Sequence, residues 1–199
     1  IPKELELNHD CVENISCTPE VEIRNCYFTR TSTRGTLMTT PRKVIIANNT
    51  YYKTGMSAIL IEGDAEGWYE SGPVKDVLIQ NNIFIDCAYN GGPEYAVIAL
   101  NPSNTIIDAA HPVHRNVRII GNTFQTFGNP VLYAKSTEGL VFKDNKVTST
   151  PLPGGALQKP VFILNGSKNV TIKDNILKGT FRENIVFRNM KKGFIKTDL

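Results

Sequence analysis

The segment with the densest potential chemistry is residues 61–72, Ile-Glu-Gly-Asp-Ala-Glu-Gly-Trp-Tyr-Glu-Ser-Gly, which holds four carboxylates and the only tryptophan of the chain. Paired carboxylates perform acid and base catalysis on sugars, and an aromatic ring can stack on the C–H face of a pyranose. Alternation along a strand through Ile59 and Ile61 places Glu62 and Asp64 on one face, where like charges raise at least one pKa. The pattern predicts a sugar site, and the structural alternative is a solvated loop that caps a repeat.

Three further residues extend this predicted site. Trp68 and Glu70 lie in the same polar segment, where an exposed tryptophan is costly unless it binds something. Arg34 lies in the string Thr-Ser-Thr-Arg-Gly and could hold a pair of sugar hydroxyls or one of the acids Glu62 and Asp64. The structural alternative for Arg34 is an ion pair with an acid of the next repeat.

Two histidines form a weaker candidate. His111 and His114 lie three residues apart in a proline-containing segment that also holds Asp108. Metal sites do use such residues, but this spacing is not specific for one. We expect exposed loop histidines, no bound metal and no cofactor.

Composition excludes several function classes. The 22 basic and 19 acidic residues leave a net charge of +3, spread evenly, which argues against a nucleic-acid or anionic-membrane partner. The chain contains no run of 18 apolar residues that could span a bilayer. The cysteines form no C-x-x-C pair, and we expect four small buried thiols, with a Cys11–Cys17 bridge as the alternative in an exported protein.

An imperfect repeat, V-x-I-x-x-N-x-F, defines the elements that must position these groups. Six copies occur between residues 21 and 177, with the Asn place at 26, 49, 82, 122, 145 and 175, and a cysteine fills the first. A base period of about 23 residues with variable insertions is typical of a solenoid.

The repeat also predicts the local structure. Its first four residues alternate apolar and polar, which indicates a strand with one buried face. We expect each Asn to adopt the left-handed conformation of a tight corner and to bond the backbone of the next coil. A second apolar segment follows each copy, so the fold class is all-β: a right-handed parallel β-helix of about six to seven coils, rather than a leucine-rich repeat or a β-sandwich.

The predicted organisation is one β-helix domain over residues 1–199, with a lead-in coil at 1–20, repeat coils at 21–190 and a tail at 191–199. The opening Ile-Pro-Lys-Glu resembles neither an initiator methionine nor a signal peptide, so we expect a piece of a longer precursor. An uncovered coil end would expose unpaired strand edges, and we therefore expect possible self-association there.

Two insertions interrupt the regular spacing. The chain takes 17 residues from Leu60 to Val77 and 19 from Ile98 to Val117, whereas the other comparable connections take seven or eight. These connections should leave one edge of adjacent coils, about 5 Å apart. We expect the two long loops to build a wall or cleft, the usual place of function on a solenoid.

Several strings between residues 12 and 145 are specific enough to compare with known families. The most specific is the run from Ile59 to Gly72, and the others are Val12–Val21, Thr33–Gly35, Thr39–Val44, Asn116–Ile119 and Pro130–Ala134. Together these strings resemble glycoside hydrolase family 110, the α-galactosidases that act on terminal α-1,3-linked galactose.

The resemblance implies a metal-independent, inverting hydrolysis by two carboxyl groups. The family's catalytic aspartates are expected in an Asp-Asp string N-terminal to the matched region, and this chain contains no Asp-Asp pair. By resemblance, Glu62, Asp64 and Trp68 are assigned to sugar contact, with Arg34 and Glu70 as further contacts. The catalytic acids are expected to precede this chain.

Two other functions fit the same pattern. One is a stand-alone carbohydrate-binding or adhesive β-helix that grips a glycan without cleaving it. The other is a pectin lyase or polygalacturonase, but anionic uronates favour a basic cleft with bound calcium, whereas the segment around Glu62 is acidic. We therefore expect a neutral terminal α-galactoside as the ligand, and a periplasmic or secreted protein by family resemblance.

Overall fold

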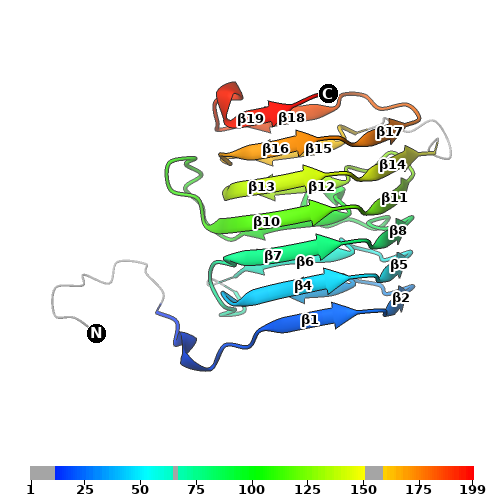
Figure 1. Ribbon diagram of the computed structural model, residues 1–199. Helices are drawn as coiled ribbons and strands as arrows, with labels where there is room; N and C mark the ends of the chain where they lie inside the picture. The colour runs from blue at the N-terminus through cyan, green and yellow to red at the C-terminus, as the bar shows by residue number, and fades with distance from the viewer. Residues whose placement is uncertain (1–11, 65–66, 151–158) are drawn as a thin grey trace.

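The computed structural model describes residues 12–64, 67–150 and 159–199, in which nearly all regular structure is β-strand (Figure 1). The strands form three parallel sheets, with seven strands in sheet A and six in each of sheets B and C. Each coil contributes one strand to sheet A, then one to B, then one to C. The predicted parallel β-helix of six to seven coils is confirmed. No helix in the described ranges is long and apolar enough to cross a membrane.

Sheet A contains the first half of each repeat and begins a seventh coil. The predicted tail, residues 191–199, contains the last strand of this sheet. In spatial order, the strands of sheet A are β1 (Val21–Arg24), β4 (Lys43–Ala47), β7 (Asp76–Gln80), β10 (His114–Ile120), β13 (Thr137–Lys143), β16 (Val170–Lys173) and β19 (Ile195–Thr197).

Sheets B and C complete each coil. The strands of sheet B are β2 (Tyr27–Thr29), β5 (Thr50–Tyr52), β8 (Ile83–Ile85), β11 (Thr123–Thr126), β14 (Lys146–Ser149) and β17 (Ile176–Lys178). The strands of sheet C, which are the predicted second apolar segments, are β3 (Thr36–Met38), β6 (Ile59–Gly63), β9 (Ile98–Pro102), β12 (Leu132–Lys135), β15 (Phe162–Asn165) and β18 (Ile185–Arg188).

The core consists of columns of equivalent side chains from successive coils. Phe28, Tyr51, Phe84 and Phe124 are register partners in sheet B, and their rings stack at centroid distances of 4.7 to 5.1 Å. Offset stacking of this kind adds to the gain from burying the rings. The register that brings the rings together also places the polar residues of one coil beside those of the next.

A ladder of asparagines joins the coils at the corner between sheets A and B. Asn82, which is 1% exposed, accepts the backbone N–H of Asn49 at 2.9 Å and donates to the carbonyl of Ile46 at 2.9 Å. Its amide also donates to the side-chain oxygen of Asn122 at 3.0 Å. The predicted backbone bonding by stacked asparagines is confirmed, because these amides satisfy groups that the corner would otherwise leave unpaired.

The conformational part of that prediction was wrong. The left-handed residue of each corner is the one before the ladder position, for example Asn48 with φ +58° and Asn81 with φ +54°. The turn therefore needs a residue that tolerates positive φ, while the ladder residue is held by its side-chain bonds. The residues that take this turning position are Asn25, Asn48, Asn81, Gly121, Asp144 and Asp174.

The cysteines differ from expectation in their burial. Cys87 is a buried free thiol, but Cys17 and Cys26 are exposed free thiols. Cys26 occupies the ladder position of the first coil, where little of the protein covers it. Cys11, the other half of the alternative bridge, lies outside the described residues.

Candidate functional site

The predicted site lies on the outer face of sheet C, at the ends of β6 and β9. Ile59 and Ile61 point into the main core, so Leu60 and Glu62 occupy the opposite face. Glu62 is the register partner of Asn101, whose amide donates to a Glu62 carboxylate oxygen at 3.4 Å. Sequence reasoning missed Asn101, although it follows Ile98 at the same spacing at which Glu62 follows Ile59.

Three of the other four predicted site residues lie within electrostatic reach of Glu62. Burial is the main cause that raises the pKa of Glu62, and the negative charges of Glu70 and Asp64 raise it further. The Asn101 hydrogen bond and the Arg34 guanidinium act in the opposite direction. The structure thus brings two acids of the loop, Asp64 and Glu70, and an arginine of the preceding coil within reach of Glu62 at the end of β6.

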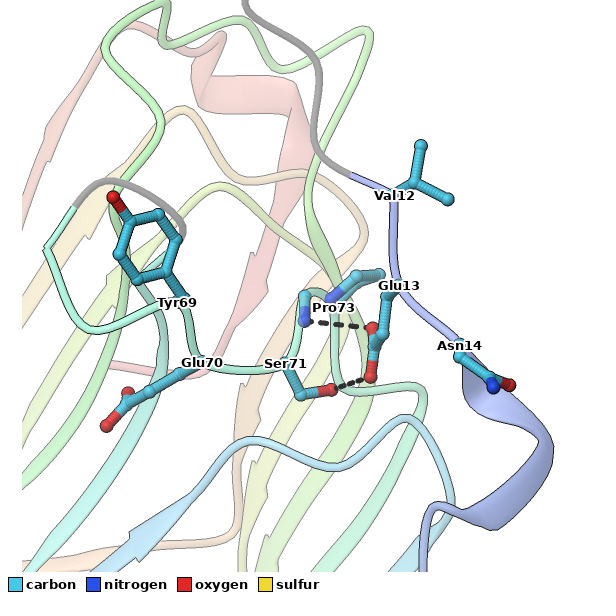
Figure 2. A pocket seen from close by; sticks show the side chains of 8 residues that line it. Val12, Glu13, Asn14, Tyr69, Glu70, Ser71 and Pro73 are labelled. Atoms are coloured by element: carbon cyan, nitrogen blue, oxygen red, sulfur yellow. Dashed lines mark hydrogen bonds between the residues drawn. The ribbon is translucent and has the colours of Figure 1, made fainter. Parts of the chain in front are cut away.

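Glu70 has an unused acceptor at this site. One of its carboxylate oxygens is buried and has no hydrogen-bond partner within the described part of the chain. Figure 2 shows the Glu70 side chain pointing away from Glu13, on the other side of the 69–73 segment. A buried carboxylate oxygen without a partner is costly, and a ligand hydroxyl that donates to it would remove that cost.

Asp64 has a structural role that the sequence did not reveal. β6 ends at Gly63, so Asp64 lies past the strand rather than on its face as predicted. Its side chain accepts the N–H of Gly67 at 2.7 Å, and its carbonyl accepts the N–H of Glu70 at 2.8 Å. Asp64 therefore closes the loop that carries Glu70, and its predicted contact with sugar stays a prediction.

Two aromatic side chains lie at the surface of the same loop. Trp68 is 79% exposed and Tyr69 is 84% exposed. Tyr69 also has a positive φ of +54°, a conformation that residues other than glycine seldom adopt without a local reason. Exposed aromatic faces beside carboxylates are a common arrangement for stacking on sugar rings.

Glu13, in the segment before β1, is hydrogen-bonded to the C-terminal part of this loop. Both oxygens of Glu13 accept hydrogen bonds, from the Ser71 hydroxyl and from the Gly72 N–H, the latter at 3.1 Å (Figure 2). A cavity of about 650 Å³ lies between the two segments, lined by Val12 to Asn14 and Tyr69 to Pro73. No pattern in the sequence indicated Glu13, because the contact joins residues 58 and 59 positions apart.

The two long loops begin side by side, as predicted, and then diverge. The carbonyl of Gly63 accepts the N–H of Ser103 at 3.1 Å, which joins the bases of the loops. The first loop continues toward Glu13 in the lead-in. The second packs in the opposite direction: Lys168 Nζ donates to the carbonyl of Ala110 at 3.3 Å. The predicted wall therefore exists only at the bases of the loops.

The histidines occupy two different environments. His111 is exposed and lies 2.8 Å from Asp108, whereas His114 is buried, contrary to expectation. His114 Nδ1 accepts the N–H of Val74 at 3.3 Å, and burial lowers its pKa to about 3, which keeps it neutral. Within the ranges that the structure describes, no group of three or more His, Cys, Asp or Glu residues is placed to hold a metal ion.

The fold of the chain agrees with the family to which its sequence is similar. A family profile described as "Right handed beta helix region" matches residues 12–197, so the chain belongs to the right-handed β-helix family. The predicted handedness is thereby confirmed.

Known proteins with similar sequences include α-1,3-galactosidases. Alpha-1,3-galactosidase A of Bacteroides fragilis is 67% identical over 201 residues, which is all of this chain and 33% of that protein. Alpha-1,3-galactosidase B of Bacteroides thetaiotaomicron is 42% identical over 93% of this chain and 31% of its own length. The predicted resemblance to α-1,3-galactosidases is confirmed, and the chain spans about a third of the length of these relatives.

Proposed function

We propose that this chain is the sugar-binding part of an α-1,3-galactosidase and that the outer face of sheet C binds a terminal α-galactoside. The observation that carries the proposal is the cluster of Glu62, Glu70 and Arg34, in which Glu70 comes from the loop that also carries the exposed rings of Trp68 and Tyr69. Charged hydrogen-bonding groups hold sugar hydroxyls, and an aromatic face covers the apolar side of galactose. The names of the relatives support this choice of sugar.

The reaction itself is proposed to depend on groups outside this chain. Inverting hydrolysis needs one carboxylic acid to protonate the leaving oxygen and a second carboxylate to activate water. By family resemblance those groups are a pair of aspartates in preceding coils, and this chain contains no Asp-Asp string. Glu62, Glu70 and Arg34 then position the ring, with no metal or cofactor required by the mechanism.

A second candidate is a glycan-binding β-helix without catalytic activity. It is favoured by the same lack of an Asp-Asp string, and it requires only the binding groups on the outer face of sheet C. A pectin-type enzyme fits less well, because the three acids Glu62, Asp64 and Glu70 would repel an anionic uronate.

Binding by the chain is tested by titration calorimetry with methyl α-galactoside. We expect weak binding, with Glu62→Gln and Trp68→Ala each lowering affinity at least about tenfold, or ~1.4 kcal/mol. Tyr27→Ala removes another exposed ring, on sheet B rather than sheet C, and serves as the control, with affinity unchanged. Unchanged affinity in both site variants would remove the sugar site from this face.

Catalysis is tested on the longer parent protein. We expect it to release galactose from an α-1,3-galactoside, with Glu62→Gln reducing kcat/KM, while the chain of 199 residues alone releases none. Binding without release by the parent would favour the glycan-binding alternative. The proposal includes a periplasmic or secreted location, which cell fractionation of the parent checks.

A further inference from the structure

The backbone of Ser71 and Gly72 is held from two sides. On one side it lies against Gly63 at the end of β6, where a Cβ atom added to Gly63 would lie 2.9 Å from the Gly72 carbonyl oxygen. On the other side, the Glu13 carboxylate accepts the Ser71 hydroxyl and the Gly72 N–H (Figure 2). The close approach of the strand end and the two hydrogen bonds together fix this part of the loop.

The segment that follows Glu13 is itself bound to the first coil. Arg42, between β3 and β4, donates to the carbonyl of Ile15 at 2.7 Å, a charge-assisted hydrogen bond. The Thr40 hydroxyl donates to the carbonyl of Pro19 at 2.8 Å. Glu13 therefore reaches the loop from a backbone that the solenoid anchors.

The held part of the loop carries Glu70 toward the predicted site. The Glu70 N–H donates to the carbonyl of Asp64 at 2.8 Å, and the next two residues make the contacts with Glu13. Its carboxylate lies on the opposite side of the segment from Glu13 (Figure 2), where its negative charge raises the pKa of Glu62. Glu13 can therefore influence Glu70 only through the backbone that joins them.

Backbone strain beside Glu70 makes this hold important. Tyr69 has a φ of +54°, and its side chain is 84% exposed, so few side-chain contacts fix its conformation. A strained conformation persists only where the surrounding contacts determine it. Here those contacts are the bond to Asp64 on one side of the strained residue and the bonds to Glu13 on the other. Without Glu13, we expect the segment to relax and Glu70 to lose its orientation.

We propose that Glu13 is a positioning residue of the sugar site: by holding Ser71 and Gly72, it keeps the Glu70 carboxylate oriented toward a bound α-galactoside. This inference rests on the function proposed above. A loop that is ordered before binding loses less conformational entropy when the ligand arrives, so affinity depends on the Glu13 contacts. Loss of the hold weakens binding without removing any group that touches the sugar.

Glutamine at position 13 provides a matched variant. In Glu13→Gln, Oε1 can accept the Gly72 N–H and Nε2 can donate to the Ser71 oxygen, because a hydroxyl both donates and accepts. Glu13→Ala removes both contacts. Glu20→Ala removes an exposed acid of the same segment and serves as the control. Far-UV circular dichroism confirms that each variant is folded.

Trp68, the only tryptophan of the chain, lies in this loop and reports its order without any ligand. We expect time-resolved fluorescence anisotropy to show larger nanosecond motion of the Trp68 ring in Glu13→Ala than in the unaltered chain. Glu13→Gln and Glu20→Ala should resemble the unaltered chain. Equal anisotropy decays in Glu13→Ala and the unaltered chain would overturn the inference, whether or not the chain binds galactose.

Titration calorimetry with methyl α-galactoside tests the effect on binding. We expect Glu13→Ala to weaken binding about tenfold and Glu13→Gln to retain most of the affinity. In a Glu70→Gln chain, adding Glu13→Ala should weaken binding much less, because the carboxylate that Glu13 positions has already been changed.

The outcomes separate this inference from the proposed function. If Glu70→Gln weakens binding but Glu13→Ala does not, or if the losses of the two substitutions simply add, Glu13 is not a positioning residue. If Glu70→Gln binds as tightly as the unaltered chain, the sugar site itself is refuted, and with it the role of Glu13 in binding.

Discussion

The asparagine ladder provides the most direct test of how the coils are held in register, and Asn82→Leu is the variant we develop. Leucine has the same branched arrangement of four side-chain heavy atoms as asparagine, although it is larger, and it can neither donate nor accept hydrogen bonds. The substitution removes the partners of two backbone groups, the N–H of Asn49 and the carbonyl of Ile46. Both lie in the interior, since Ile46 is fully buried and Asn49 is 1% exposed.

The magnitude follows from those two groups. A buried polar group without a partner costs about 1–3 kcal/mol, so Asn82→Leu should lower the free energy of unfolding by about 4 kcal/mol. The matched control is Asn175→Leu at the last rung, which removes the partners of the Asn145 N–H and the Phe142 carbonyl. Asn175 is only partly buried, so water can replace its bonds and the cost should be about 1 kcal/mol.

Urea unfolding followed by far-UV circular dichroism measures both variants against the unaltered chain. The urea concentration at the unfolding midpoint should fall several times further in Asn82→Leu than in Asn175→Leu. The m-values of the two variants should be similar. Asn145 and Phe142 are as buried as Asn49 and Ile46, so the two variants differ in the access of water at the substituted residue. Equal losses in the two variants would refute the argument, because they would show that this access does not set the cost. A loss below about 1 kcal/mol in Asn82→Leu would refute it as well.

Two further predictions concern pH. His114 has its pKa lowered by burial from 6.5 to about 3, so its stabilising effect is complete above pH 6.5 and is lost as the pH falls toward 3. Between pH 7 and pH 5, the unaltered chain should therefore lose about 2 kcal/mol more stability than His114→Asn in urea titrations; equal losses would contradict this. For Glu62, burial raises the pKa, so galactoside affinity should decline as the pH falls through that raised value and Glu62 gains a proton. Calorimetry at several pH values should show that galactoside affinity depends less on pH in Glu62→Gln than in the unaltered chain. The same pH dependence in both would show that Glu62 does not contact the sugar.

The fold was predictable because each coil repeats the same physical solution. Each of the six copies alternates apolar residues, which are Val and Ile in five of them. Only one arrangement buries all of these side chains, and that is a stack of parallel strands. The corner was predicted less well. Asparagine both tolerates positive φ and bonds the backbone, and the sequence did not show that Asn81 performs the first role and Asn82 the second.

The site was predictable only where it follows the strands. Glu62 and its outward direction follow from the alternation along β6. Asp64 lies beyond the strand, where local turn chemistry replaces alternation, and its side chain bonds Gly67. Glu13 reaches Ser71 through a contact between distant segments, and no periodic pattern records such a contact.

The proposed mechanism places a geometric demand on the missing catalytic pair. Neighbouring strands of a sheet lie about 4.8 Å apart, so carboxyl groups on the outer face of sheet C are spaced in multiples of that distance. Inverting glycosidases need carboxyl groups about 6.5–9.5 Å apart, whereas about 5 Å suits a retaining mechanism. Acids stacked directly on adjacent coils would therefore be too close for inversion. The two residues of an Asp-Asp string are consecutive, and within a strand their side chains would point to opposite faces. The proposed inverting reaction therefore requires the string to lie at a corner or in a loop, where both carboxyl groups can face the sugar. Glu62, whose position relative to the coils is fixed by its pairing with Asn101, then binds the ring beside that pair.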